Sequence, residues 1–336
     1  MVSIIIPVTS INTYLNESIV QILNLEEQQF EVLILPDDGA CAKLAVPTEQ
    51  LRGKVRVIPT GSLGPAAKRN IGAKQARGEI LAFLDDDAYP RRDWLTRALT
   101  HFEDAEIAAV GGPAVTPPDD SFWQKVSGAV YLSPLGGGNS HRYWPGKKTY
   151  FVDDWPSVNL LIRKRDFDNA GGFDSRYWPG EDTKLCLDLT HKLNKKILYD
   201  PDVVVWHHRR EGLGRHLRQV GGYGLHRGFF AKTFPETSLK GKYFLPALFV
   251  LFLMTGLLLI LVDNAVMRTL YYSGSGLYLA ALGVAFFQIT HKGQNFAVAF
   301  ASLPYIVLTH ICYGIHFLQG LVFTKELKRK LRRSTT

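Results

Sequence analysis

Cysteine is scarce in this chain of 336 residues. Its three cysteines, Cys41, Cys186 and Cys312, lie far apart and show no paired spacing. This pattern argues against a zinc knuckle and fits a reducing compartment. The N-terminus also lacks the long apolar run and the basic flank of a signal peptide. We therefore expect the first domain to stay in the cytoplasm.

Lysine, arginine, aspartate and glutamate are absent from three stretches near the C-terminus, residues 243–262, 270–290 and 296–324. Each is long enough to cross a bilayer, which needs roughly 20 apolar residues. We expect a multi-pass protein of the inner (plasma) membrane, with full spans at 243–262 and 270–290, because two spans keep the basic tail in the cytoplasm. The third stretch would then lie in the interface or re-enter the bilayer.

Basic residues outnumber acidic ones, and the net charge is +8. Several of them follow the last apolar stretch directly, as Lys325, Lys328, Arg329, Lys330, Arg332 and Arg333. Clusters in this position contact anionic lipid headgroups. The aromatic residues lie largely in apolar segments and not in a basic patch, so membrane lipids are expected partners and nucleic acid is not.

The first half of the chain alternates short apolar segments with amphipathic ones. We expect strands at residues 2–7, 30–35, 55–58 and 80–84, and helices at 14–28 and 65–76. This order predicts an α/β fold with a mostly parallel sheet and flanking helices.

The apolar run at 80–84 ends in Asp85, Asp86 and Asp87. Because unpaired buried charge is costly, these acids should lie at the C-terminal edge of a strand. In an open α/β sheet this edge faces the ligand crevice, where Asp85 and Asp87 would offer oxygen ligands to a divalent cation that holds a diphosphate. The alternative is an acidic turn that caps a helix starting near Arg91.

Asp37 and Asp38 follow the expected strand at 30–35 and should reach the same edge of the sheet. There they could meet the base or ribose of a nucleotide, although a simple turn is the alternative. Lys68 and Arg69 lie in the first turns of the expected helix at 65–76. Their position fits an anion site made from a helix N-terminus and a guanidinium.

Residues 113–154 show no clear periodicity and contain many proline, glycine and aromatic residues. Such a long stretch is usually a functional loop or lid, and we expect acceptor contacts there. A later strand at 199–206 should deliver His207 and His208 to the sheet edge, with His207 favoured as a metal ligand. Asp182 precedes an expected helix at 183–193, where it is either a functional carboxylate or an N-cap.

Several short motifs occur in order between Val2 and Arg227. They are Val2-Ser3-Ile4-Ile5-Ile6-Pro7-Val8, Asp37-Asp38-Gly39, Arg69-Asn70-Ile71-Gly72, Gly78-Glu79-Ile80, Asp85-Asp86-Asp87, Gly171-Gly172-Phe173-Asp174, Gly180-Glu181-Asp182 and Val205-Trp206-His207. In this combination the chain resembles the family 2 glycosyltransferases of GT-A type. Members of that family transfer a sugar from a nucleotide donor with inversion at the anomeric carbon.

The resemblance implies a hexosyltransferase-type enzyme that uses Mg²⁺ or Mn²⁺. It implies that Asp87 binds the metal, with His207 as an expected second ligand, and that Asp182 is the catalytic base supported by Glu181. The expected donor-binding residues are Pro7, Thr9, Asp37, Asp38, Lys68, Arg69, Asp85 and Asp86. The expected acceptor or interfacial residues are Trp178, Arg218, Gln219 and Arg227.

These expectations divide the chain into three regions. Residues 1–211 would form a cytoplasmic catalytic domain, with a nucleotide-sugar half at 1–112 and an acceptor half at 113–211. Residues 212–240, which are basic and aromatic, suit an interfacial amphipathic helix. Residues 241–336 would hold the transmembrane helices and the basic tail.

Two features bear on the donor nucleotide and on the number of sugars transferred per event. Residues 9–12 read Thr-Ser-Ile-Asn where the family usually has Tyr-Asn, so the nucleotide stays open, with a UDP-sugar as our first expectation. The Gln-x-x-Arg-Trp motif of processive synthases is absent, which favours one sugar per event.

The chemistry of the acceptor follows from the need for a base. A phosphate monoester is already ionised at neutral pH and needs no base. The Glu181-Asp182 pair therefore favours a hydroxyl of a lipid-linked or cell-envelope glycan as the acceptor.

Two other classes of protein were weighed. A non-catalytic sugar-nucleotide-binding scaffold of a membrane polysaccharide assembly complex would keep Asp38 and Asp87 without needing Asp182. A nucleotidyltransferase would carry a glycine-rich loop after the first strand, and residues 7–12 contain no glycine.

Overall fold

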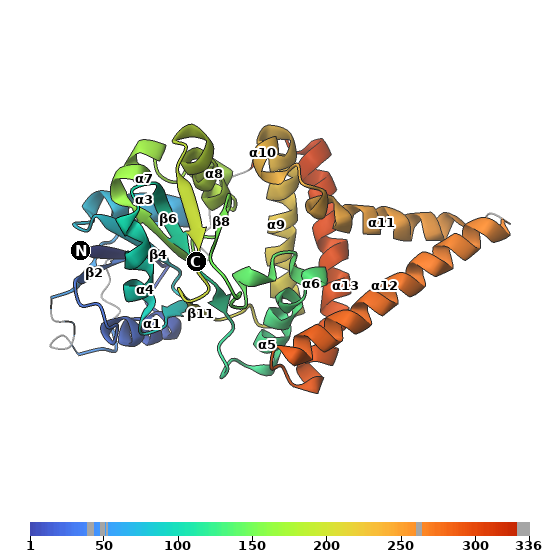
Figure 1. Cartoon of the computed structure of the whole chain (residues 1–336), viewed down its shortest axis with the longest axis horizontal. Coiled ribbons are helices and arrows are strands. Elements are labelled where there is room, and N and C mark those ends of the chain that lie inside the picture. Colours follow the sequence, from blue (N-terminus) through green and yellow to red (C-terminus); the bar gives the residue numbers. More distant parts are fainter. Residues whose placement is uncertain (39–43, 48–50, 52, 260–263, 328–336) are drawn as a thin grey trace. The chain divides into compact units, whose positions relative to one another are not determined.

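The computed structural model describes residues 1–38, 44–47, 51, 53–259 and 264–327. Two compact units divide the chain (Figure 1). The first contains residues 1–115 and 144–208 together with Leu327, and the second contains residues 116–143 and 209–326. Gly39, Cys41 and the basic tail beyond Leu327 lie outside the described residues.

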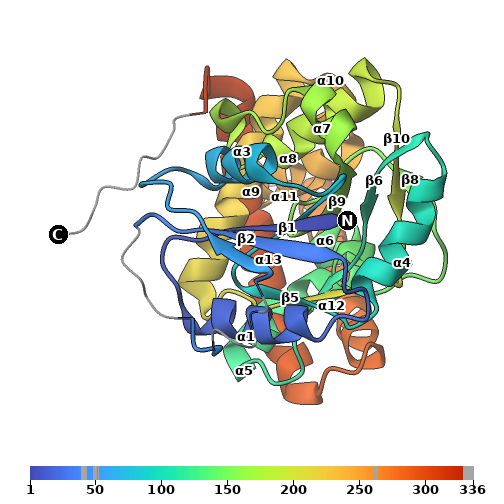
Figure 2. The same cartoon turned by 90° about the vertical axis from the view of Figure 1, so that its left-hand side faces the viewer.

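An eight-stranded sheet forms the centre of the first unit, in the order β3-β2-β1-β4-β9-β6-β10-β8 (Figure 2). The strands are β1 Val2–Pro7, β2 Phe30–Leu35, β3 Val55–Val57, β4 Ile80–Leu84, β6 Ile107–Gly111, β8 Tyr150–Val152, β9 Asn159–Arg163 and β10 Lys196–Tyr199. β3, β2, β1 and β4 run parallel, as do β6 and β10, whereas β9 is antiparallel to β4 and β6, and β8 to β10. The predicted α/β fold is confirmed, with a mixed sheet.

Helices cover both faces of this sheet. α1 (Thr13–Leu23) and α4 (Trp94–Thr100) pack on one face, and α3 (Pro65–Gln75), α7 (Lys164–Ala170) and α8 (Glu181–Leu187) pack on the other. The short helical turn η1 (His101–Glu103) follows α4. Two others flank α8: η4 (Ser175–Tyr177) precedes it and η5 (Asp188–Lys192) follows it.

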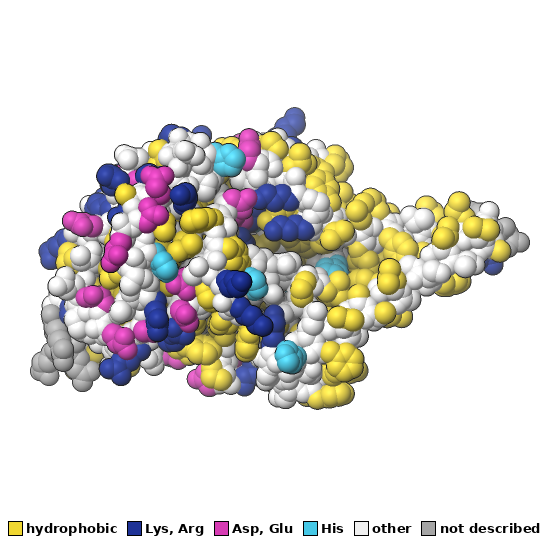
Figure 3. All heavy atoms as spheres, viewed as in Figure 1, with side chains coloured by type: hydrophobic (Ala, Val, Ile, Leu, Met, Phe, Trp, Pro, Cys, Tyr) yellow, Lys and Arg dark blue, Asp and Glu magenta, His cyan; other side chains and the backbone are white. Residues whose placement is uncertain are grey.

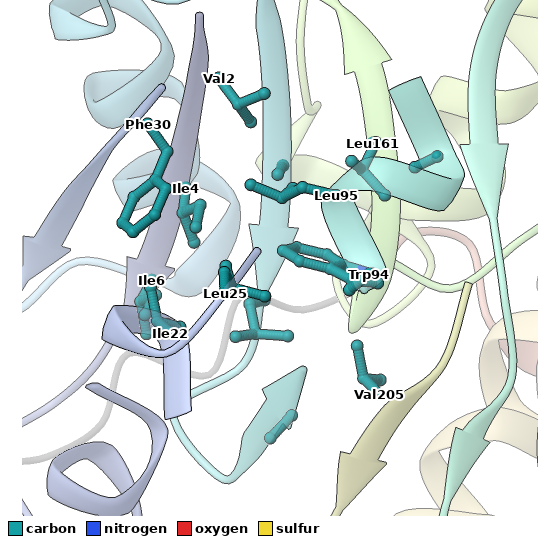
Figure 4. Packing of buried hydrophobic residues seen from close by; sticks show 14 of the residues in the cluster. Val2, Ile4, Ile6, Ile22, Leu25, Phe30, Trp94, Leu95, Leu161 and Val205 are labelled. Atoms are coloured by element: carbon teal, nitrogen blue, oxygen red, sulfur yellow. The ribbon is translucent and has the colours of Figure 1, made fainter. Parts of the chain in front are cut away.

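Burial on both faces explains the apolar residues Ile4, Ile5 and Ile6 of β1. Ile4 and Ile6 belong to the core beneath α1 and α4, where Trp94 and Leu95 lie (Figure 4). Ile5, which points to the opposite face, belongs to the core beneath α3 and α7. A strand covered on both faces is typically a near-continuous apolar run, because both sets of alternating side chains are buried.

A second, three-stranded sheet in the order β5-β11-β7 corrects one expectation. Its strands are β5 Ala88–Pro90, β11 Val205–His207 and β7 Ala114–Val115. The single strand expected at 199–206 is instead β10 of the large sheet and β11 of the small one. A turn at 200–202 separates them: the Asp200 carboxylate accepts a hydrogen bond from the Asp202 amide at 2.8 Å, and Pro201 has no amide hydrogen to continue a ladder.

The second unit is helical. Its elements are α5 Phe122–Ala129, η2 Val130–Leu132, α6 Pro134–Gly137, η3 Ser140–Arg142, α9 Leu213–Thr233, α10 Pro235–Ser238, α11 Gly241–Leu259, α12 Ala265–His291, α13 Phe296–Leu318 and η6 Gln319–Phe323. α9 is glycine-rich because the backbone of α13 lies against it: a β-carbon on Gly224 or Gly228 would come within 2.5 Å of the carbonyl oxygen of Tyr313 or 2.0 Å of that of Phe317.

Residues 113–154, expected to form a loop without regular structure, contain the short helices α5, η2, α6 and η3 and the strands β7 and β8. The acceptor contacts expected there stay a prediction. Ser121 caps α5, and a reciprocal hydrogen bond from the Ser121 amide to the Gln124 side chain completes a capping box. The Ser-x-x-Gln spacing was the sequence signal for this helix. Proline and glycine between the short helices hid it.

Two helices in the described part of the chain are long and apolar enough to cross a membrane, judged by length and composition. They are α12, Ala265–His291, with a mean hydropathy of 1.3, and α13 continued by η6, Phe296–Phe323, with 1.6. The stretch expected to lie in the interface therefore forms one continuous apolar helix. The stretch expected as the first span forms α11, whose apolar part is shorter, and residues 260–262 of it lie outside the described residues.

Asn159 is a fully buried polar residue at the centre of the first unit. Its amide donates to the carbonyl oxygens of Pro113 (3.1 Å) and Val203 (2.7 Å) and accepts from the indole of Trp94 (2.9 Å). One side chain thus joins β9 to α4 and to the segments before β7 and β11. Buried polar groups need such partners, because an unmade hydrogen bond costs about 1–3 kcal/mol.

We predict that Asn159→Ala destabilises the protein by about 3 kcal/mol, since the Trp94 indole and two carbonyl groups lose their buried partner. A fall of several degrees in the melting temperature of the detergent-solubilised protein would measure this. Asn24→Ala, at an exposed position, is the control and should melt like the wild type. Equal melting of Asn159→Ala and wild type would contradict the role given to this residue.

Candidate active site

The acidic turn after β4 is folded back by the small sheet. The Ala88 amide bonds to the Asp85 carbonyl at 3.2 Å, and the chain enters β5, which runs antiparallel to β11 with Ala88 opposite His207. The His208 amide donates to the Asp87 carbonyl at 2.9 Å. This pairing places His207, from the far end of the domain, beside the acids.

Asp85, Asp87 and His207 form a group that can hold a metal ion. Their ligand atoms all lie within 4.8 Å of one another, and His207 Nε2 is 3.1 Å from Asp87 Oδ1. Two carboxylates and an imidazole suit Mn²⁺, and the carboxylates alone suit Mg²⁺. The donor set therefore fits the expected cofactor, with Asp85 as a ligand beside Asp87.

His208 has a different environment. Its Nε2 lies 3.1 Å from the Glu17 carboxylate of α1, and its ring lies 4.4 Å from that of Tyr14. The geometry thus separates the two neighbouring histidines, with His207 in the acidic group and His208 against α1.

Asp86 is held by a residue that the sequence analysis missed. The Asn12 amide donates to Asp86 Oδ2 at 2.7 Å, while its carbonyl oxygen accepts from the Leu15 amide at 2.9 Å and caps α1. Asparagine directly before a helix was the available signal for the cap. The contact with Asp86, 74 residues away, follows only from the fold.

Arg69 joins the two halves of the site. This buried guanidinium contacts Asp85 Oδ1 at 2.5 Å and Glu181 Oε1 at 3.3 Å. Asp85 stands at the end of β4 and Glu181 at the start of α8, so one side chain from α3 ties both elements together. Glu181 is itself buried, and its second oxygen has no hydrogen-bond partner among the described residues.

The residue after Arg69 fixes the loop before α8. Asn70 donates to the Phe173 carbonyl at 2.7 Å and accepts from its amide at 2.9 Å. Gly171 and Gly172 precede Phe173 and have φ of +93° and +72°. Residues with a β-carbon rarely adopt this backbone conformation. The ordered motifs at 69–72 and 171–174 are therefore two sides of one contact.

Lys68 does not form the anion site expected from its position. Its ammonium is buried and contacts the Val8 carbonyl at 2.6 Å, the Leu35 carbonyl at 3.1 Å and the Asp37 carboxylate. Arg69 is likewise engaged by carboxylates. Lys68 therefore holds the ends of β1 and β2 and orients Asp37.

The other expected donor-side residues line the same end of the sheet. Pro7 ends β1, and the Thr9 carbonyl accepts from the Asp37 amide at 3.0 Å. Asp37 is half-buried against Lys68, and Asp38 is exposed.

Asp182 is half-buried at the start of α8. Its carboxylate accepts from the Thr183 amide at 2.7 Å and lies 3.4 Å from the Ser157 amide. Trp178, expected at the acceptor side, is 40% exposed in the loop before α8. The remaining acceptor-side residues are in the second unit on α9: Arg218 is exposed, Gln219 is half-buried, and buried Arg227 stacks over Tyr243 at 4.8 Å.

Residues 3–163 match the family model described as Glycosyl transferase family 2. This domain belongs to glycosyltransferase family 2. A pre-mycofactocin glycosyltransferase from Mycobacterium tuberculosis is 28% identical over 224 residues, which cover 66% of this chain and 46% of that protein. The chain thus matches less than half the length of that relative.

Two further similarities extend beyond the family 2 domain. An enzyme from Methanococcus voltae is 23% identical over 334 residues, covering 96% of this chain and 97% of that protein. Its name is dolichyl N-acetyl-alpha-D-glucosaminyl phosphate 3-beta-D-2,3-diacetamido-2,3-dideoxy-beta-D-glucuronosyltransferase. The mannosyltransferase PcManGT from Pyrobaculum calidifontis, solved with GDP-Man and Mn²⁺, aligns with a TM-score of 0.59 at 19% identity, covering 90% of this chain and 85% of that one. This likeness supports the GT-A fold.

Burial gives Glu181 an unusual pKa. Loss of hydration and the neighbouring Asp182 raise the pKa of Glu181 to about 7 from 4.5, although the Arg69 charge opposes the shift. The folded state therefore holds this proton more tightly than the unfolded chain does. The resulting stabilisation is complete below about pH 4.5 and is lost as the pH rises through about 7.

We predict that Glu181→Gln, which cannot ionise, gains stability relative to the wild type between pH 5 and pH 8, by up to about 3 kcal/mol. Melting temperatures in detergent with EDTA and without donor would measure the difference. Glu103→Gln, at an exposed position, should show no such trend. A constant difference between Glu181→Gln and wild type across this range would contradict the raised pKa.

We predict that His207→Ala weakens Mn²⁺ binding by at least about tenfold, since even an outer-shell partner of a metal site is worth that much. The matched control is His208→Ala, which changes the adjacent histidine and should leave Mn²⁺ affinity near wild type. Titration followed by the Mn²⁺ electron paramagnetic resonance signal would measure both. Equal losses in the two variants would argue against His207 as a ligand.

Proposed function

We propose that this protein transfers one sugar per event, with inversion, from a nucleoside-diphosphate sugar to a hydroxyl of a lipid-linked or cell-envelope glycan. The observation that carries the proposal is the link from Asp85 through Arg69 to Glu181. It joins the metal-fitting group of Asp85, Asp87 and His207 to the carboxylates at the start of α8. The name of the Methanococcus voltae relative, whose acceptor is a dolichyl-linked sugar phosphate, supports the acceptor class.

In the proposed reaction the acceptor hydroxyl attacks the anomeric carbon as the bond to the nucleoside diphosphate breaks. Asp182 takes the hydroxyl proton, and its position in the first turn of α8 favours the ionised form that a base requires. Glu181 and Arg69 hold Asp182 in register with Asp85. A divalent cation bound by Asp85, Asp87 and His207 would supply positive charge opposite the departing diphosphate.

The donor nucleotide rests on fewer observations. Asp38, exposed after β2, and Asp37, oriented by Lys68, are proposed to contact the nucleoside. A UDP-sugar is our proposed donor. The GDP-Man in the Pyrobaculum calidifontis structure makes a GDP-sugar the first alternative.

We further propose that the protein is an integral membrane protein with its family 2 domain in the cytoplasm. Within the second unit, α11 and α12 carry large apolar side chains that are more than half exposed, among them Leu248, Leu258, Leu270, Leu277 and Phe287 (Figure 3). Exposed apolar surface of this extent marks a site of protein or membrane interaction. α12 and α13 are the proposed spans.

The second candidate, a non-catalytic scaffold that binds a sugar nucleotide, would not require a carboxylate at Asp182. We favour the enzyme because Glu181 and Asp182 are tied to the acidic turn by Arg69.

We predict that Asp182→Asn lowers the rate of sugar transfer by about a hundredfold or more, the usual contribution of a general base, while the donor still binds. UDP-, GDP- and dTDP-sugars would first be screened for binding with and without Mn²⁺. Transfer of a tritium-labelled sugar from the best donor into lipids of membranes that carry the protein would then be measured. Asp168→Asn, an exposed carboxylate on α7, is the control.

The outcomes separate the two candidates. Mn²⁺-dependent donor binding with a large loss of transfer in Asp182→Asn supports the proposed enzyme. Donor binding with equal transfer in wild type and Asp182→Asn contradicts the base assignment, and donor binding without any transfer favours the scaffold.

A further inference from the structure

Tyr131 in η2 of the second unit is a buried phenol with no hydrogen-bond partner among the described residues. The residue is 7% exposed. Its ring stacks on that of Tyr143 at 4.4 Å, and the ring of His216 lies 5.6 Å away. A buried hydroxyl without a partner loses its hydration with no compensation. Such a group indicates a ligand that would complete it.

Arg209 lies on the same tyrosine ring. Its guanidinium is 5.1 Å from the centre of Tyr143, its Nε donates to the Thr116 hydroxyl at 3.0 Å, and the residue is 8% exposed. Its amide lies 3.3 Å from the Asp120 carboxylate. A β-carbon on Gly128 would come within 3.2 Å of Arg209 Cγ, so the glycine leaves room for the side chain in its place.

Burial keeps the phenol of Tyr131 protonated. Burial raises the pKa of Tyr131 well above its usual value, and the positive charges of Arg209 and Arg210 only partly oppose that rise. At neutral pH the group is therefore an O–H donor, and the Arg209 guanidinium lies on the ring of Tyr143 that stacks on Tyr131. Arginine donors with a neutral hydroxyl donor match the oxygens of a phosphate group.

The same unit also contains the apolar helices. His216 on α9 connects α5 with the apolar helix α13. Its Nδ1 lies 2.8 Å from the Ser127 hydroxyl on α5, and its Nε2 lies 2.9 Å from the Thr309 hydroxyl on α13. α5, which leads into η2, thus lies beside the candidate span α13. A ligand with a phosphate group at Tyr131 and an apolar chain would match both features.

We infer that Tyr131 and Arg209 bind the phosphate group of the lipid carrier to which the acceptor glycan is attached. This inference rests on the proposed function and specifies how the acceptor is held. The hydroxyl that reacts belongs to the glycan, and the phosphate serves as an anchor away from the reacting bond.

The test compares farnesyl phosphate with farnesol, two probes that differ only in the phosphate. Binding to the full-length protein in detergent would be measured by microscale thermophoresis for wild type, Tyr131→Phe and Arg209→Gln. Tyr131→Phe removes a single oxygen and keeps the stacked ring. It should weaken farnesyl phosphate binding by about tenfold, the value of a hydrogen bond to a charged group, without affecting farnesol.

The matched control is Tyr313→Phe. Tyr313 is another buried phenol in this unit without a partner among the described residues, and it lies on α13, away from Arg209. The Tyr313→Phe variant should bind farnesyl phosphate as the wild type does. Equal weakening by Tyr131→Phe and Tyr313→Phe would overturn the assignment, because any buried phenol would then have the same effect.

Three other results would also overturn it. One is unchanged farnesyl phosphate binding in both Tyr131→Phe and Arg209→Gln. Another is equal affinity for inorganic phosphate and farnesyl phosphate, which would identify a free anion site. The third is an Arg209→Gln variant that no longer binds the nucleotide-sugar donor but still binds farnesyl phosphate, which would assign Arg209 to the donor. Failure of the proposed transferase would appear separately, as probe binding without sugar transfer.

Discussion

The buried guanidinium of Arg69 is the interaction on which the site depends. A charge that is taken out of water must be paired, and removal of one partner of a buried pair typically costs about 3–5 kcal/mol. Arg69 meets this requirement with Asp85, and it also contacts Glu181, which lies 112 residues away in the chain. The electrostatic need of one side chain therefore fixes the start of α8 against the end of β4. Asn70 reinforces the arrangement through the backbone of Phe173.

The same interaction distinguishes the two adjacent carboxylates on α8. Successive residues in an α-helix point about 100° apart, so Glu181 and Asp182 cannot both face Arg69. Glu181 points inward, contacts the Arg69 guanidinium, and holds its proton to about pH 7. Asp182 stays half-buried with backbone amides as its hydrogen-bond donors. The pair thus divides into one buried residue that contacts Arg69 and one half-buried residue that we propose as the base.

Rules for strand ends predicted the acids and His207 but not every neighbour. Asp85 and Asp87 were predictable because a buried strand cannot contain charge, and His207 because a strand precedes it. No sequence pattern shows that the Lys68 ammonium would reach two strand carbonyls and Asp37, and its expected part in donor binding stays a prediction. The helices of residues 116–143 were missed although Ser121 and Gln124 marked a cap. Asn12 could be recognised as a cap but not as the partner of Asp86, because that contact depends on tertiary structure.

The apolar C-terminal region shows a different limit of sequence reasoning. Counting spans by the charge of the tail placed residues 296–324 in the interface or in a re-entrant segment, whereas they form the continuous helices α13 and η6. The basic and aromatic residues of α9 predict an interfacial amphipathic helix, and the structure adds that glycines of α9 pack directly against α13. At Gly224 and Gly228 the backbone of α13 lies where a side chain would be. A helix that packs through its backbone leaves little hydrophobic periodicity in the sequence, so neither the partner of α9 nor the position of His216 between α5 and α13 could be derived from composition.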